Sequence, residues 1–325
     1  MYVFGIILLI SFIVTFITTP FFIKKLKLAG ITGSDMSKAD KPKVAEMGGI
    51  AIVTGFITAV LAAIAMSKFL GLGELTGLNV LYIFAGLSTI LIISIIGIFD
   101  DLITVRQSFK ALLPAFAALP LMAANAGVSE MAVPFYGSVD FGILYPLLLI
   151  PIGITVASNV TNMMAGFNGL EAGMGAVMTG TIAVIAVFLG EIDAAVISLA
   201  MLGGLLAFLY YNWYPARIFP GDIGTLSIGA VIATSVIIGN IETVGAILMA
   251  MYAVDVLLKA NGGFPKEVYS IKVDENNKLR CPEVVGVPSL IMRLANGITE
   301  RKLVLLLIGV EIIIAAVAIS TVLWF

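Results

Sequence analysis

Residues 79–101 read NVLYIFAGLSTILIISIIGIFDD, an uncharged and mostly apolar run that is followed by two adjacent aspartates, Asp100 and Asp101. A helix rises about 1.5 Å per residue, so about 20 apolar residues cross the hydrocarbon core of a bilayer. The stretch therefore predicts a transmembrane helix with two carboxylates at its membrane boundary. Such carboxylates are costly if they are buried unpaired.

Similar apolar runs recur along the whole chain. We expect ten spans, at residues 2–22, 47–67, 79–98, 111–126, 141–158, 170–190, 194–212, 223–240, 242–258 and 303–324. The composition agrees, since 60% of the residues are hydrophobic and only 12% are charged, against about 25% charged in an average soluble domain. The pattern predicts an all-α polytopic membrane protein that forms a single domain over residues 1–325.

Basic residues are distributed unevenly between the two faces. With ten spans, the loops at 23–46, 99–110, 159–169, 213–221 and 260–302 share one face. Of the 18 basic residues, all but Lys68 lie in these loops or, for Lys259, at the edge of the last one. By the positive-inside rule this face is cytoplasmic. We therefore expect a multi-pass protein of the cell membrane, with its chemistry on the cytoplasmic face and both termini outside.

The loop at 260–302 is the largest segment outside the expected spans. Residues from Glu267 to Val273 alternate as a strand would, residues 274–277 are typical of a turn, and Lys278 onward can return as a second strand. We predict a small β-hairpin in this cytosolic loop, before the last span.

Composition also excludes several classes of function. A net charge of −2 gives no reason to expect a nucleic acid partner, whereas the basic loops suit an anionic lipid surface or a phosphorylated ligand. The chain has no histidine, which removes imidazole as a base and as a metal ligand. Cys281 is the only cysteine, so no internal disulfide and no thiolate metal cluster can form.

Two of the cytoplasmic loops carry acidic residues next to other polar groups. The first contains Ser34, Asp35, Met36 and, before two glycines, Glu46. Glycines at the entry to a membrane helix let backbone N–H groups approach a ligand, although a solvated connector is an equally good interpretation. In the second, Asp100 and Asp101 precede Lys110, and the alternatives are solvated capping acids and a snorkelling lysine.

The two following loops add amides and a third aspartate. Asn159 and Asn162 share a helical face, Asn168 follows in a glycine-containing turn, and an amide oxygen is a plausible Mg²⁺ ligand. Asp222 follows Phe219, Pro220 and Gly221, where it either caps a helix or holds a metal. Helix-packing asparagines are the alternative for the first group. The combination on one membrane face is more specific than any single loop.

These motifs, in this order, resemble those of the polyprenyl-phosphate N-acetylhexosamine-1-phosphate transferases, of the glycosyltransferase 4 type. The likeness rests on Asp100-Asp101, on Asn159-x-x-Asn162 with Ala-Gly-Phe-Asn-Gly-Leu-Glu at 165–171, and on Phe-Pro-Gly-Asp at 219–222. That family includes the bacterial phospho-MurNAc-pentapeptide transferase and the dolichol-pathway GlcNAc-1-phosphate transferase. Lys110 and the 165–171 motif look most like the dolichol-pathway branch.

The resemblance implies a Mg²⁺-dependent reaction, with Mn²⁺ as an alternative ion. GlcNAc-1-phosphate passes from UDP-GlcNAc to a polyprenyl or dolichyl phosphate, UMP is released, and the product begins the assembly of a lipid-linked glycan. It implies Asn162 and Asp222 as metal ligands, and Lys110 and Asn159 at the lipid phosphate, with 155–163 lining its approach. Nucleotide-sugar contacts are implied for Ser34, Asp35, Met36, Glu46, Gly166 and Asn168. Asp100, Asp101, Lys110 and Asp222 form the implied catalytic set.

One segment departs from the family pattern. The family's last loop usually offers His- or Arg-rich residues to the sugar and diphosphate, whereas residues 280–288 here hold a single arginine. Arg280 and Arg293 are the candidates to replace them. The identity of the sugar and the contacts of this loop therefore stay open. The sequence also does not fix the oligomeric state, for which a homodimer is one alternative.

Two other functions are alternatives. The first is the same chemistry with another donor, such as a muramoyl-peptide or another N-acetylhexosamine nucleotide. The second is a secondary transporter, because transporters also place polar residues among many spans. Transporter sites lie near the bilayer midplane, however, whereas these residues gather at one boundary. Glu311 is the only acid well inside an expected span, either as a packing or as a lipid-facing residue.

Overall fold

The computed structural model describes residues 2–103, 106–133, 136–263 and 271–323. Its long elements are α-helices, with short π-helical or 3-10 turns at η1 (Met66–Leu70), η2 (Gly73–Leu75) and η3 (Tyr145–Leu149). The helices are α1 (Tyr2–Leu28), α2 (Gly49–Ala65), α3 (Val80–Ile103), α4 (Gln107–Ala117), α5 (Leu119–Ala123), α6 (Ile150–Met163), α7 (Leu170–Leu189), α8 (Ile192–Asn212), α9 (Gly221–Ile238), α10 (Glu242–Leu248), α11 (Ala250–Asn261), α12 (Val287–Leu294) and α13 (Glu300–Leu323).

Eight helical segments in the described residues are long and apolar enough to cross a membrane, which confirms a polytopic membrane protein. A ninth span is formed if α10 and α11, which meet at a 55° bend, are counted as one. The run expected at 111–126 is a shorter apolar segment, Phe109–Ala123, in which α4 ends at Ala117 and α5 begins at Leu119. Pro114 and Pro120 lie in these two helices, and proline removes a backbone donor from a helix.

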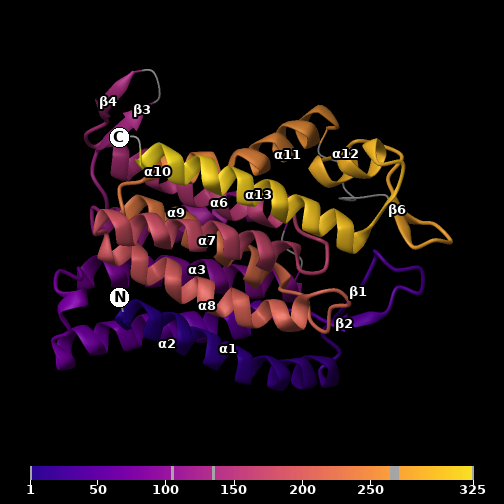
Figure 1. Ribbon diagram of the computed structural model, residues 1–325, viewed down its shortest axis with the longest axis horizontal. Helices are drawn as coiled ribbons and strands as arrows, with labels where there is room; N and C mark the ends of the chain where they lie inside the picture. Colours follow the sequence, from indigo (N-terminus) through magenta and orange to yellow (C-terminus); the bar gives the residue numbers. More distant parts are fainter. Residues whose placement is uncertain (1, 104–105, 134–135, 264–270, 324–325) are drawn as a thin grey trace.

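The helices lie side by side in an elongated bundle (Figure 1). Helix α9 occupies its centre and is the most buried span, packed against α3, α6, α8, α2 and α7. Helix α1 begins and α13 ends at the same end of the bundle, on the left of Figure 1. The small strands β1, β2 and β6 lie at the opposite end, which is the end where the polar motifs of the sequence gather.

Three small sheets in the described residues lie at the ends of the bundle. Strands β1 (Thr32–Ser34) and β2 (Lys43–Ala45) pair antiparallel in the loop between α1 and α2. Strands β5 (Lys272–Val273), β6 (Lys278–Arg280) and β7 (Ile298–Thr299) form an antiparallel sheet, in which β5 and β6 make a hairpin before the last helix. The remainder of the first strand expected there, 267–270, lies outside the described residues. A further hairpin, β3 (Glu130–Val133) with β4 (Gly137–Asp140), was not anticipated.

Helix boundaries are the main correction to the sequence interpretation. Helix α3 continues to Ile103, so Asp100 and Asp101 belong to its last turn rather than to a loop. Helix α9 begins at Gly221, so Asp222 lies in its first turn rather than before it. Hydropathy places a boundary where charge begins, whereas a helix can continue when its charged residues find partners, as these do.

Two glycines bring the helices around α9 into backbone contact. A Cβ on Gly97 of α3 would lie 2.4 Å from the Cα of Ile223, and a Cβ on Gly49 of α2 would lie 2.3 Å from the backbone N of Gly224. Close approach of this kind is the usual role of small residues where membrane helices cross. Both crossings lie beside Asp222, so they set the position of the polar end of α9.

We predict that Gly97→Ala lowers the free energy of unfolding by about 1–3 kcal/mol, because the added Cβ forces the backbones of α3 and α9 apart. Gly309→Ala is the matched control, since nothing lies within 4 Å of its Cβ in α13. Thermal unfolding of the purified protein in detergent measures both. The midpoint of thermal unfolding should fall for Gly97→Ala and not for Gly309→Ala. An unchanged midpoint in Gly97→Ala would contradict the close backbone contact between α3 and α9.

Candidate active site

A carboxylate at the N-terminus of α9 is the centre of the polar cluster. One oxygen of Asp222 lies 2.5 Å from the ammonium of Lys110, and the other accepts a hydrogen bond of 3.1 Å from the amide of Asn162. Lys110 also pairs with Asp100 of α3. Side chains from α3, α4, α6 and α9 therefore meet at one point, as the sequence had suggested for these motifs.

Asp101 has a different environment from its neighbour Asp100. Its two oxygens accept the backbone N–H groups of Asp222 at 2.8 Å and of Ile223 at 3.2 Å. The first N–H groups of a helix have no partner within the helix, and a carboxylate that accepts them also meets the positive end of the helix dipole. Asp101 is thus a capping acid, but it caps α9 from the neighbouring helix α3.

A cavity of about 320 Å³ opens beside Asp222. All six residues predicted to contact a nucleotide sugar and both predicted metal ligands line it. The complete lining consists of Ser34, Asp35, Met36, Glu46, Asn162, Ala165, Gly166, Phe167, Asn168, Glu171, Phe219, Pro220, Gly221, Asp222 and Thr225. Three of the loops of the sequence interpretation, at 23–46, 159–169 and 213–221, therefore contribute to this one cavity.

The cavity is acidic. Asp35, Glu46, Glu171 and Asp222 line it, and no lysine or arginine among the described residues does. Burial raises the pKa of Glu46, and the charge of nearby Lys43 partly opposes that rise. The nearest positive charges contact the lining acids from outside: Lys110 on Asp222 and Lys38 on Asp35, the latter at 2.6 Å. An anionic ligand in this cavity needs additional positive charge.

Asn168 lines the cavity and forms hydrogen bonds with three separate segments of the chain. Its Nδ2 donates to Asp35 at 3.0 Å and to Glu300 at 2.7 Å, and its Oδ1 accepts the backbone N–H of Ala216. Only 2% of the residue is exposed. Because the amide is bonded in three directions, Asn168 holds the first loop, α13 and the 213–219 segment together at the cavity.

Glu171 is a lining residue that sequence reasoning left without a role. One of its oxygens accepts the backbone N–H of Gly166 at 2.5 Å, and the residue is buried. Gly166 has φ +130°, a conformation that L side chains rarely adopt. Glu171 thus fixes the turn that follows Asn162. Its presence as the acidic residue of the 165–171 motif was the sequence feature that could have pointed to this role.

Like Asp100, Asp101 and Lys110, three other residues singled out in the sequence lie outside the lining: Asn159, Arg280 and Arg293. Asn159 donates to the carbonyls of Ala111 and Thr155, and so ties α6 to α4 next to Lys110. Arg280 bonds Asp274 at 3.2 Å and Asn296 at 3.1 Å within the loop before α13. Neither Arg280 nor Arg293 is among the residues that line the cavity.

Glu311 is fully buried in α13, and neither of its oxygens has a hydrogen-bond partner among the described residues. The lipid-facing interpretation is therefore wrong, and the packing interpretation holds. Nothing in the described structure explains why an acid occupies this position.

Comparison with known proteins identifies the family that this chain resembles. The sequence profile of glycosyl transferase family 4 matches residues 83–240. A protein of Saccharolobus solfataricus, provisionally named UDP-N-acetylglucosamine–dolichyl-phosphate N-acetylglucosaminephosphotransferase, is 38% identical over 96% of this chain and 94% of its own length. A protein of the same provisional name from Sulfolobus acidocaldarius is 35% identical over the same shares.

Relatives of a second kind match at lower coverage. The phospho-N-acetylmuramoyl-pentapeptide-transferase of Shouchella clausii is 32% identical over 77% of this chain and 79% of its own length. Both kinds of relative are named for the transfer of a sugar phosphate, which favours the enzyme over the transporter. The chain belongs to glycosyl transferase family 4 and is a phosphoglycosyl transferase.

Proposed function

We propose that this enzyme transfers GlcNAc-1-phosphate from UDP-GlcNAc to a polyprenyl phosphate of the dolichyl type and releases UMP. The observation that carries the proposal is the convergence on one cavity of every residue implied for the nucleotide sugar, together with Asn162 and Asp222. The donor is chosen because the relatives that cover 96% of the chain are named for UDP-N-acetylglucosamine and dolichyl phosphate. The product would begin a lipid-linked glycan.

In the proposed reaction an oxygen of the lipid phosphate attacks the β-phosphorus of UDP-GlcNAc. The bond between that phosphorus and the oxygen bridging to the α-phosphate breaks, and UMP leaves with the bridging oxygen. A phosphomonoester has a second pKa of about 6, so the acceptor is mostly a dianion at neutral pH. The reaction therefore needs no strong general base, which suits a chain without histidine.

The cavity wall fits a Mg²⁺ or Mn²⁺ ion. Asp222 and Asn162 are adjacent, and a half-turn of the amide of Asn162 would present its oxygen in place of its nitrogen. No three His, Cys, Asp or Glu side chains within the described ranges lie together in a group that would hold a metal. This suits Mg²⁺, which is usually held by one or two carboxylates, water and substrate phosphates. When bound, the ion would offset negative charge on the diphosphate.

The remaining polar residues divide into binding and positioning roles. Lys110 would bind the phosphate of the acceptor, since its ammonium already bridges two carboxylates at the edge of the cavity. Asp100 would orient Lys110, and Asp101 would position Asp222 by capping α9. In phosphoryl transfer, positioning and charge stabilisation account for most of the catalysis.

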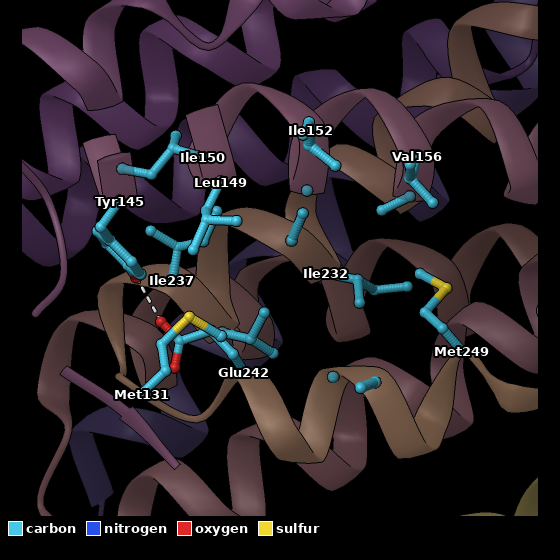
Figure 2. A pocket seen from close by; sticks show the side chains of 16 residues that line it. Met131, Tyr145, Leu149, Ile150, Ile152, Val156, Ile232, Ile237, Glu242 and Met249 are labelled. Carbon is cyan, nitrogen blue, oxygen red and sulfur yellow. Dashed lines mark hydrogen bonds between the residues drawn. The ribbon is translucent and has the colours of Figure 1, made fainter. Parts of the chain in front are cut away.

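An apolar groove gives the lipid chain a place to lie. A second cavity, of about 310 Å³, is bounded by α6, α9 and α10, and the hydrogen bond from Tyr145 to Glu242 lies at one end of it (Figure 2). Ile152 and Val156 of α6 line it and are exposed, so it opens toward hydrocarbon. Ile152, Val156 and Asn159 are spaced four and three residues apart in α6, so they lie on one face of that helix. A prenyl chain along this face would lead to Asn159 and Lys110.

The membrane orientation belongs to the same proposal. The strands β1, β2 and β6 lie at the end of the bundle opposite the start of α1 and the end of α13 (Figure 1). The basic loops of the sequence lie at the end of the bundle that carries β1, β2 and β6. The positive-inside rule therefore favours a cytoplasmic active site and both termini outside. Soluble UDP-sugars would reach the cavity from this side.

The same chemistry with a muramoyl-pentapeptide donor is the second candidate. It is favoured by the relatives named phospho-N-acetylmuramoyl-pentapeptide-transferase. A donor screen decides between the two. We expect purified protein with polyprenyl phosphate and Mg²⁺ to release UMP from UDP-GlcNAc in proportion to the lipid-linked product, and to lose activity in a chelator. Turnover of the muramoyl-peptide donor alone would contradict the proposed sugar, and turnover in the chelator would contradict the metal.

We predict that Asp222→Asn lowers kcat by about a hundredfold or more, because it removes the charge that would hold the metal at the reacting diphosphate. Asp274→Asn is the control, since Asp274 lies in the exposed hairpin turn and does not line the cavity. Initial rates of UMP release across a Mg²⁺ titration measure the effect. A variant that keeps near-normal turnover would disprove the metal assignment.

Lys110→Met should raise the KM for polyprenyl phosphate more than the KM for UDP-GlcNAc, because the ammonium is assigned to the acceptor headgroup. A charge-assisted hydrogen bond contributes about 1.5–3 kcal/mol, which corresponds to roughly a tenfold or larger change. Initial rates with each substrate varied in turn separate the two constants. Equal changes in both would contradict the assignment.

Filling the apolar groove tests the path of the lipid chain. Gly153 lines the groove, and a Cβ there would meet only the side chain of Ile237 at 3.8 Å. We predict that Gly153→Leu raises the KM for a long polyprenyl phosphate and leaves that for a short, water-soluble prenyl phosphate unchanged. Gly309→Leu, on α13, is the size-matched control. An unchanged KM for the long acceptor would exclude this groove as its site.

A further inference from the structure

We propose that a buried ion pair on α11, Asp255 with Lys259, is a positioning element for the donor site. Both residues lie one turn apart in the second half of the bent span, and their charged groups are 2.5 Å apart. Asp255 is 1% and Lys259 is 4% exposed. Neither residue lines the cavity. The inference rests on the proposed function, because it takes Asn162 and residues 165–168 as part of the donor site.

The lysine connects the pair to the helix that carries Asn162. The ammonium of Lys259 donates a hydrogen bond to the carbonyl of Met163, the last residue of α6 and the neighbour of Asn162. The last carbonyls of a helix lack intrahelical partners and carry the negative end of the helix dipole. A positive charge at this point therefore holds the end of α6, from which the cavity-lining turn 165–168 departs.

The aspartate connects the pair to the cytosolic loop. One oxygen of Asp255 contacts Lys259, and the other accepts the backbone N–H of Val287 at 2.7 Å. Val287 is the first residue of α12, so the carboxylate meets the positive end of that helix. Gly286 makes this approach possible, because a Cβ there would lie 2.5 Å from the carboxylate oxygen. The pair thus joins the end of α6, the start of α12 and α11 itself.

The energetics favour positioning over stability as the role of this pair. Removing two charges from water costs several kcal/mol per ion, and neutral replacements of a buried pair are often as stable as the original. What the neutral pair D255N/K259M loses here is the hydrogen bond to the carbonyl of Met163 and the negative charge at the N–H of Val287. Helix α11 follows the groove-lining helix α10 directly at the 55° bend. The pair therefore also fixes the position of the acceptor groove relative to the cavity-lining turn 165–168.

A double-mutant cycle tests the proposal. Asp255→Asn and Lys259→Met should each lower the thermal midpoint, because each leaves one buried charge without its partner. The double variant D255N/K259M should recover most of that loss. Its kcat should nevertheless remain about ten- to hundredfold low and its KM for UDP-GlcNAc should rise, because a small displacement of a positioned group is costly to the rate. The KM for the acceptor should change least.

The exposed ion pair of the hairpin, Asp274 with Arg280, supplies the matched control. D274N/R280Q likewise neutralises one acid and one base, here in the hairpin before α13, and should leave kcat and both KM values unchanged. Wild-type kcat and donor KM in D255N/K259M would overturn the proposal. So would a double variant as unstable as the single ones, because the pair would then be structural.

Hydrogen exchange supplies a readout that does not depend on activity. Backbone amides of residues 163–169 should exchange faster in D255N/K259M than in the wild type, while those of α9 stay protected. Unchanged exchange in 163–169 would overturn the positioning role even if no donor were turned over. Absence of transfer by the wild-type protein would instead count against the proposed function alone.

Discussion

The site depends on one partly buried contact: the carboxylate of Asp222, placed at the start of the most buried helix and shared between Lys110 and Asn162. A carboxylate at a membrane boundary is costly unless it is paired and hydrogen-bonded. Asp101 supplies the second half of the arrangement, because it accepts the N–H groups that begin α9. The close crossings at Gly97 and Gly49 then hold the helices at the distance that these contacts need.

Much of the fold follows from the sequence because a bilayer leaves few choices. Apolar runs of about 20 residues become helices, since every backbone group must be satisfied within its own segment. The polar motifs then fall at helix ends, and an alternating topology puts them on one face. For the same reason the cavity-lining residues were predictable: Ser34, Asp35, Glu46 and Gly166 lie in the loops that this topology brings together.

The partners of individual side chains were not predictable, because each depends on which helices are neighbours. Nothing local distinguishes Asp100, which pairs with Lys110, from Asp101, which caps a helix more than a hundred residues later. Likewise Asn168 belongs to a motif that resembles nucleotide-binding residues, yet its amide bonds Asp35 and Glu300 across the fold. Short segments were also missed: the β3–β4 hairpin has no long apolar pattern, and the bend between α10 and α11 interrupts a continuous one.

Charge balance connects the two substrates of the proposed reaction. A nucleotide diphosphate and a lipid phosphate are both anions, and they would meet beside a cavity whose lining residues are acidic and include no lysine or arginine among the residues described. Lys110 is the cation that contacts Asp222 within the described part of the chain, and one ammonium cannot neutralise both ligands. Under the proposed function, the additional positive charge would enter with the donor as a divalent ion, for which Asp222 and Asn162 would be the ligands. On this proposal the acidic wall would make donor binding conditional on the metal, and Lys110 would exchange its contact with Asp222 for the phosphate of the acceptor.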